Sequence, residues 1–97
     1  MKLGMYSIFD RKAESYASPF YAANDAAAMR LFVMEGQRDE SMIRMFPSDY
    51  ELCCVGDFDD QSGLVSAPPK GVRQLLTGSD VKRLSTLPTS AGKENEA

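Results

Sequence analysis

Hydrophobic residues recur with two different periods in the first third of the chain. Residues 2–10 alternate loosely between apolar and polar side chains and are rich in aromatic and β-branched types, which predicts a strand. Residues 24–36 instead show helical spacing in a segment of strong helix formers. Asn24 is a suitable N-cap and Gly36 a suitable end. A strand followed by a helix of about three turns is therefore predicted.

Further along the chain, a nearly continuous apolar run within residues 50–58 predicts a buried strand. The polar segment 59–63 is typical of a hairpin turn, and residues 64–66 begin a third strand. The predicted fold is α+β, with one helix packed on a small, mostly antiparallel sheet in the order βαββ. We expect a compact domain over residues 1–76 and a flexible polar tail over residues 77–97, disordered toward its C-terminal end.

Composition narrows the class of protein. The chain has 97 residues, 43% of them hydrophobic, which fits one domain with a modest core. The net charge of −3 disfavours a basic protein that coats nucleic acid through its overall charge. Charge is uneven, however: residues 49–60 carry −5 and residues 61–93 carry +4. No apolar run is long enough to cross a bilayer, and the first residues do not resemble a signal peptide, so no membrane partner is expected.

Catalytic and metal sites find little support in these residues. The chain contains no histidine, so triads that need one are excluded, and no phosphate-binding glycine loop occurs. Cys53 and Cys54 are adjacent, too close for an ordinary disulfide, and are predicted to be packing residues in a reducing setting. The segment from Asp57 begins like a calcium loop but fails at Ser62 and Pro68, where that loop needs glycine and glutamate. We therefore predict a protein without catalytic residues, metal or cofactor.

Two kinds of binding surface remain open. Arg11 and Lys12 follow an aromatic strand, and further aromatic residues lie close by, as in proteins that hold single-stranded nucleic acid. The alternative is that the aromatic residues form the core and the basic pair lies on a solvated turn. Four methionines are either core residues or part of an adaptable interaction surface; they are Met29, Met34, Met42 and Met45.

Several short motifs resemble one small family. They are the segment 6–13 (YSIFDRKA), then Pro19-Phe20, then the segment 47–52 (PSDYEL), then Gly56 with the segment 58–60 (FDD) and Gly63. In this order and spacing the chain resembles the nonstructural protein of gokushovirus-type microviruses, which are small icosahedral phages with single-stranded DNA. The resemblance implies a role in phage DNA replication, at the change to synthesis of single strands, in the cytoplasm of the host bacterium.

The resemblance and the residues together lead to one main functional prediction. It is a nonenzymatic regulator of viral DNA synthesis that binds single-stranded DNA. Phosphates are assigned to Arg11, Lys12, Lys70, Arg73, Lys82 and Arg83, and base stacking to Tyr6, Phe20 or Tyr21.

The alternative is a protein-interaction module that inhibits or recruits the phage replication initiator or a host replication protein. Its contact would be the acidic turn with Asp57, Asp59 and Asp60, because such a turn competes for a basic DNA-binding surface. A homodimer that covers an exposed edge of the small sheet is also expected.

Overall fold

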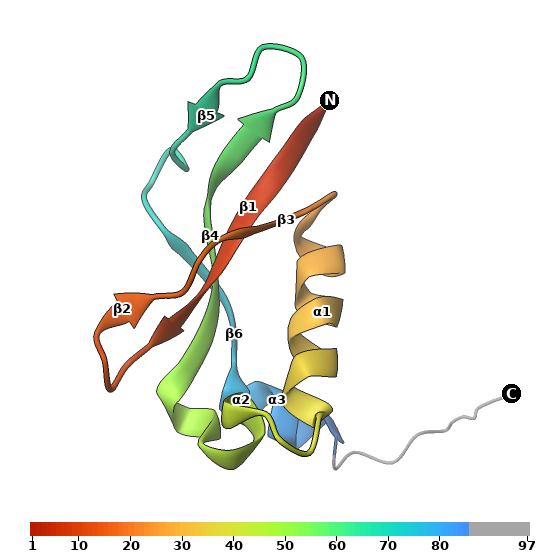
Figure 1. Ribbon diagram of the computed structural model, residues 1–97, viewed down its shortest axis with the longest axis vertical. Coiled ribbons are helices and arrows are strands. Elements are labelled where there is room, and N and C mark those ends of the chain that lie inside the picture. Colours follow the sequence, from red (N-terminus) through yellow and green to blue (C-terminus); the bar gives the residue numbers. More distant parts are fainter. Residues whose placement is uncertain (86–97) are drawn as a thin grey trace, which may run out of the picture.

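Two long antiparallel strands, β1 (Lys2–Asp10) and β4 (Tyr50–Asp59), form the centre of the sheet in the computed structural model, which describes residues 1–85 (Figure 1). Each central strand pairs along its outer side with two short strands. These are β2 (Ser15–Tyr16) and β3 (Phe20–Ala22) beside β1, and β5 (Val65–Ser66) and β6 (Arg73–Thr77) beside β4. All pairs are antiparallel, so the predicted α+β class and sheet type are confirmed, with more strands than the three expected.

The helices lie on one side of this sheet. Figure 1 shows α1 (Asp25–Gln37) alongside the central strands, with α2 (Met42–Met45) and α3 (Gly78–Ser85) near its C-terminal end. A short 3-10 turn, η1 (Pro47–Asp49), leads from α2 into β4. The core therefore forms between one face of the sheet and the helices.

The predicted helix is confirmed at its start and differs at its end. The Asn24 side chain accepts a hydrogen bond of 2.9 Å from the backbone N–H of Ala27, as expected for an N-cap. Gly36 does not end the helix, which continues to Gln37. Gly36 is buried, and a Cβ there would lie 2.9 Å from Cγ1 of Val81, so glycine at this position allows α1 to approach α3 closely.

Helix α3 corrects the predicted boundary and tail. Thr77 and Asp80 cap its first turn reciprocally, with Asp80 N–H donating to Thr77 Oγ1 at 3.0 Å and Thr77 N–H to Asp80 Oδ2 at 2.9 Å. Val81 is 2% exposed and belongs to the core. Residues 78–85 of the predicted flexible tail thus form a helix, and the buried side chain of Val81 attaches this polar segment to the domain. The rest of the predicted tail, residues 86–97, lies outside the described residues.

Strand register decides which side chains enter the core. Tyr6 lies opposite Cys54 and Ile8 opposite Leu52, on the face that packs against the helices. The register shifts after Met5, so β4 contributes one extra residue at that point. The fully or nearly fully buried hydrophobic cluster consists of Tyr6, Ala22, Ala28, Phe32, Ile43, Leu52, Cys54 and Val81.

Candidate nucleic-acid interface

The face of the sheet that points away from the helices carries two pairs of aromatic rings. Phe9 and Tyr16 lie opposite each other on β1 and β2, with ring centroids 4.7 Å apart. Tyr21 on β3 and Phe58 on β4 have centroids 5.6 Å apart, above Leu3 and Met5 of β1. Alternation along β1 places Leu3, Met5 and Phe9 on the face opposite to Tyr6. Among the described residues no helix covers this face, which we call the open face (Figure 1).

Between the two aromatic pairs, the middle of the open face is shielded from solvent. Ser7 and Cys53 lie opposite each other there and are 2% and 3% exposed. The Ser7 hydroxyl donates a hydrogen bond of 2.6 Å to the carbonyl of Ala17, which brings the chain after β2 over this point. In contrast, Tyr16 and Tyr21 are each 50% exposed. Each end of the open face thus offers one accessible tyrosine backed by a phenylalanine.

Arg11 lies beside the Phe9–Tyr16 pair. Its Nε donates to Glu51, which faces Phe9 across the β1–β4 pair, so the guanidinium reaches over the open face. The backbone N–H of Arg11 also donates to the carbonyl of Asp49 at 2.8 Å, which fixes the end of β1. The predicted neighbourhood of Arg11 and aromatic residues is therefore present, with Phe9 and Tyr16 as the aromatic residues.

Lys12 lies in the turn that follows Arg11. The Asp10 carboxylate accepts hydrogen bonds from the backbone N–H groups of Lys12 and Ala13, at 2.9 and 3.2 Å, and so organises the turn. Glu14 adopts a left-handed backbone conformation with φ of 57°. The Lys12 side chain is exposed at the same end of the sheet as Arg11.

Two of the three aromatic residues predicted to stack on bases face the core instead. Tyr6 is 1% exposed, and its hydroxyl donates a hydrogen bond of 2.8 Å to Asp25. Phe20 packs against the core, with its ring centroid 5.9 Å from that of Tyr6. Tyr6 therefore cannot stack on a base without unfolding, and Phe20 lies on the wrong face. Of the predicted set, Tyr21 alone reaches the open face.

Arg73 takes part in a polar group on the side of the sheet that faces the helices. Its Nη1 and Nη2 donate to the two carboxylate oxygens of Asp25 at 3.0 and 3.3 Å. This pairing lowers the pKa of the Asp25 carboxyl, against the opposing effect of burial. The pKa of Tyr6 is raised, first by burial and then by its hydrogen bond to Asp25. Tyr6, Asp25 and Arg73 thus form one polar group that ties β1, α1 and β6 together.

The remaining predicted cations do not join Arg11 in one patch. Lys70 lies in the exposed loop between β5 and β6, and Lys82 and Arg83 lie on α3. Arg83 is within 3.5 Å of Asp80 on the same helix. The positive charges of Lys70, Arg73, Lys82 and Arg83 are therefore distributed over separate elements, because the chain folds into a loop, an outer strand and a helix at these positions.

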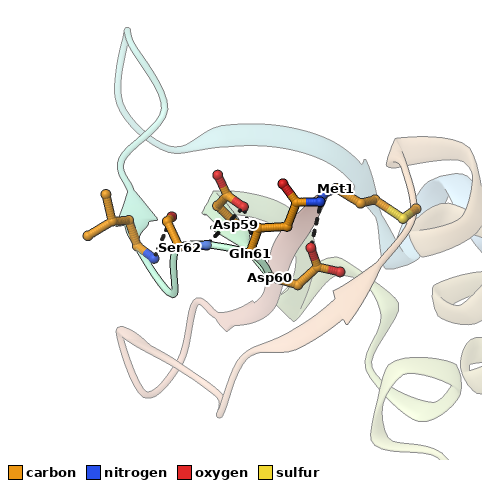
Figure 2. Close-up of polar contacts among 6 residues, drawn as sticks. Met1, Asp59, Asp60, Gln61 and Ser62 are labelled. Carbon is orange, nitrogen blue, oxygen red and sulfur yellow. Dashed lines mark hydrogen bonds and ion pairs between the residues drawn. The ribbon is translucent and has the colours of Figure 1, made fainter.

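The acidic turn has local structural roles, which Figure 2 shows. Asp59 Oδ1 accepts hydrogen bonds from the backbone N–H groups of Gln61 and Ser62, at 2.9 and 3.4 Å, and these bonds lower the pKa of Asp59. Asp60 pairs with the N-terminal ammonium group at 2.9 Å. Asp57 lies within β4, between Gly4 and Ser66. Two of the three carboxylates predicted to bind a partner are therefore engaged within the fold.

Sequence reasoning missed the aromatic residues that define the open face. Phe9, Tyr16 and Phe58 were not assigned to stacking, although strict alternation along β1 separates Phe9 from Tyr6. Cys53 and Cys54 are buried and free, as predicted for packing residues, and burial raises the pKa of Cys53. Within residues 1–85 no group of side chains suited to hold a metal ion occurs. No helix in this part of the chain is long and apolar enough to cross a membrane.

Comparison with known proteins places the chain among phage proteins. Residues 3–81 match the model of a family described as Phage ORF5 protein. Over 84 residues the sequence is 29% identical to Protein ORF5 of Chlamydia phage 1, which covers 82% of this chain and 88% of that protein. No solved structure matches the chain significantly. The expected relation to a small microvirus protein is thereby supported, while its replication role stays a prediction.

Proposed function

The chain belongs to the Phage ORF5 protein family, and on that basis we propose that it is a nonenzymatic phage protein that binds single-stranded DNA through the open face. The observation that carries the proposal is the pair of half-exposed tyrosines, Tyr16 and Tyr21, each backed by a phenylalanine. Aromatic side chains on an open sheet can stack on bases of any sequence, because every base has a π-face. Arg11 and Lys12 supply contacts to phosphate at one end.

Binding of the viral strand would explain a regulatory role without catalysis. A protein that covers single strands in the host cytoplasm prevents their conversion to duplex and so favours the strands that are packaged. Because the chain carries a net charge of −3, the open face has to supply most of the affinity through stacking, with few phosphate contacts. The proposal therefore predicts a modest salt dependence rather than the steep dependence of a basic coat protein.

The test is fluorescence anisotropy of a labelled single-stranded oligonucleotide of about 16 nucleotides, the upper end of the usual site size. Tyr16→Ala and Tyr21→Ala should each weaken binding by about fivefold or more, since stacking contributes about 1–3 kcal/mol per base. Phe46→Ala is the matched control, because Phe46 is also 50% exposed but lies beside α2, away from the open face.

Salt dependence provides the second half of this test. With Arg11 and Lys12 each neutralising one phosphate, the slope of log K against log salt should be about −1.4. Replacing Arg11 by Gln should reduce it to about −0.7. Equal binding by wild type, Tyr16→Ala and Tyr21→Ala would refute the stacking role, and no binding even at low salt would refute the DNA function.

A protein-interaction module is the second candidate, and one observation favours it. Met34, Met42 and Met45 are 61%, 51% and 53% exposed, whereas Met29 packs against the core. Exposed methionines adapt readily to a partner surface. This candidate predicts that the phage replication initiator or a host replication protein binds α2, and that Met42→Ser and Met45→Ser weaken its capture. Asp60→Lys tests the acidic turn separately, because Asp60 is not needed for the backbone of that turn.

A further inference from the structure

A pocket lies where the three helices meet, on the other side of the molecule from the open face. It encloses about 270 Å³ between the C-terminal end of α1, α2 and the start of α3. Its lining residues are Gly36, Gln37, Ile43, Arg44, Gly78, Val81 and Lys82. This volume is slightly below that of pockets for drug-sized ligands, about 300–1,000 Å³, so the pocket suits a small molecule.

The lining combines apolar walls with positive charge. Ile43 and Val81 belong to the core and form apolar walls, while Arg44 and Lys82 each contribute one positive charge. Among the residues that the structure describes, no carboxylate lines the pocket, although the whole chain carries a net charge of −3. A second depression beside α2 contrasts with it, since Glu35 and Glu40 line that one together with a single cation, Arg38.

Close packing of the helices and one hydrogen bond set the positions of the residues that line the pocket. Gly36 allows α1 to contact Val81 and Ile43, and a Cβ at Gly78 would overlap the backbone of Pro47 in η1. Arg44 Nη1 donates a hydrogen bond of 3.1 Å to the carbonyl of Gln37, which positions the guanidinium at the end of α1. That bond uses one of the five N–H donors of an arginine side chain. The same Nη1 also forms an ion pair of 3.8 Å with Asp39, whose side chain is 93% exposed and is not among the lining residues.

We propose that this pocket binds a small organic phosphate monoester, of the size of a nucleoside monophosphate. A phosphate monoester carries a charge of about −1.5 to −2 at neutral pH, which is opposite in sign to the charges of Arg44 and Lys82. Arginine suits phosphate oxygens because its planar donors reach two of them, and lysine adds a point charge. The apolar walls then receive the organic part of the ligand. The proposal is independent of DNA binding on the open face.

The test is titration of the ¹⁵N-labelled full chain with thymidine 5′-monophosphate, followed by NMR. The backbone N–H signals of Gly36, Gly78 and Val81 should shift in a saturable way, and those of Phe9, Tyr16 and Tyr21 should not. Thymidine without phosphate should cause no such shifts, and inorganic phosphate should bind more weakly because it leaves the apolar walls empty.

Variants separate the pocket from general attraction to anions. Arg44→Gln and Lys82→Gln should each weaken binding by about tenfold or more, in keeping with loss of a charge-assisted contact. Arg30→Gln is the matched control, because Arg30 is exposed on α1 outside the pocket, and it should leave binding unchanged. No saturable shift up to about 10 mM ligand, which is weaker than the millimolar range, would overturn the proposal. Equal weakening by Arg30→Gln, or shifts confined to the open face, would also overturn it.

Discussion

Replacing Tyr6 by phenylalanine tests the role that the structure gives to this residue. The change keeps the ring in the core and removes the hydroxyl that donates to Asp25 at 2.8 Å. A hydrogen bond to a charged group contributes about 1.5–3 kcal/mol, and one between neutral groups about 0.5–1.5 kcal/mol. The Asp25 side chain is 40% exposed and keeps its bonds from Arg73, so water can replace the lost donor. We therefore expect a loss of about 1 kcal/mol in the free energy of unfolding.

The assay is thermal unfolding followed by circular dichroism. For a domain of this size, 1 kcal/mol corresponds to a fall in Tm of about 4–8 °C. Tyr50→Phe is the matched control, because Tyr50 also packs against the core and its hydroxyl makes no hydrogen bond within residues 1–85. An equal Tm for Tyr6→Phe and Tyr50→Phe would refute the argument. Tyr6→Phe should leave DNA affinity unchanged, whereas a large loss of affinity in a folded variant would restore Tyr6 as a binding residue.

Two further predictions concern the same polar group. Gly4→Ala should destabilise the domain by about 1–3 kcal/mol in a denaturant titration, because a Cβ at Gly4 would overlap the Tyr6 hydroxyl and ring; an unchanged midpoint would contradict this packing. The pKa of Asp25 is lowered in the folded state, so its contribution to stability is present above its unfolded pKa of about 3.9 and is lost as pH falls through the folded pKa. Asp25→Asn should therefore be less stable than wild type at pH 7, and the difference should shrink as the pH is lowered below about 4. At pH 2 a carboxyl group with a pKa of about 3.9 in the unfolded chain is protonated. If the stability difference between wild type and Asp25→Asn stayed constant down to that pH, the carboxylate charge would not be involved.

Local sequence signals predicted the elements, and tertiary contacts decided the rest. Asn24 predicts the start of α1 correctly, because an N-cap hydrogen bond joins residues that are neighbours in the sequence. In the sequence, Gly36 is typical of a helix end. The structure shows a different reason for glycine there, since Val81 packs against it from a position 45 residues further along the chain. Helix α3 was missed for the same reason, since Val81 is the one buried side chain among residues 79–83.

For the candidate nucleic-acid interface, the sequence indicated the types of residue, basic and aromatic, but only some of the individual residues. Arg11 lies in the short turn after β1 and pairs with Glu51, which faces Phe9, while the binding role predicted for Arg11 stays a prediction. Which aromatic residues reach the open face depends on which face of β1 packs against the helices. The sequence alone does not reveal this, because Tyr6 and Phe9 are both aromatic residues of the same strand. Scattering of Lys70, Arg73 and Arg83 follows from how β6 and α3 pack, which a count of charges along the chain does not reveal.

The central pairing of β1 with β4 has a consequence for how the chain is made. Residues 2–10 pair with residues 50–59, so the middle of the sheet joins segments about 50 positions apart. Such pairing requires closure of a long loop before any contact compensates its entropy, which slows folding. On the ribosome, β1 and β3 emerge first and have no partner for the inner side of β1 until β4 has been synthesised. The domain therefore folds late in translation, and α1 is the element that can form earliest, because all its backbone hydrogen bonds are local.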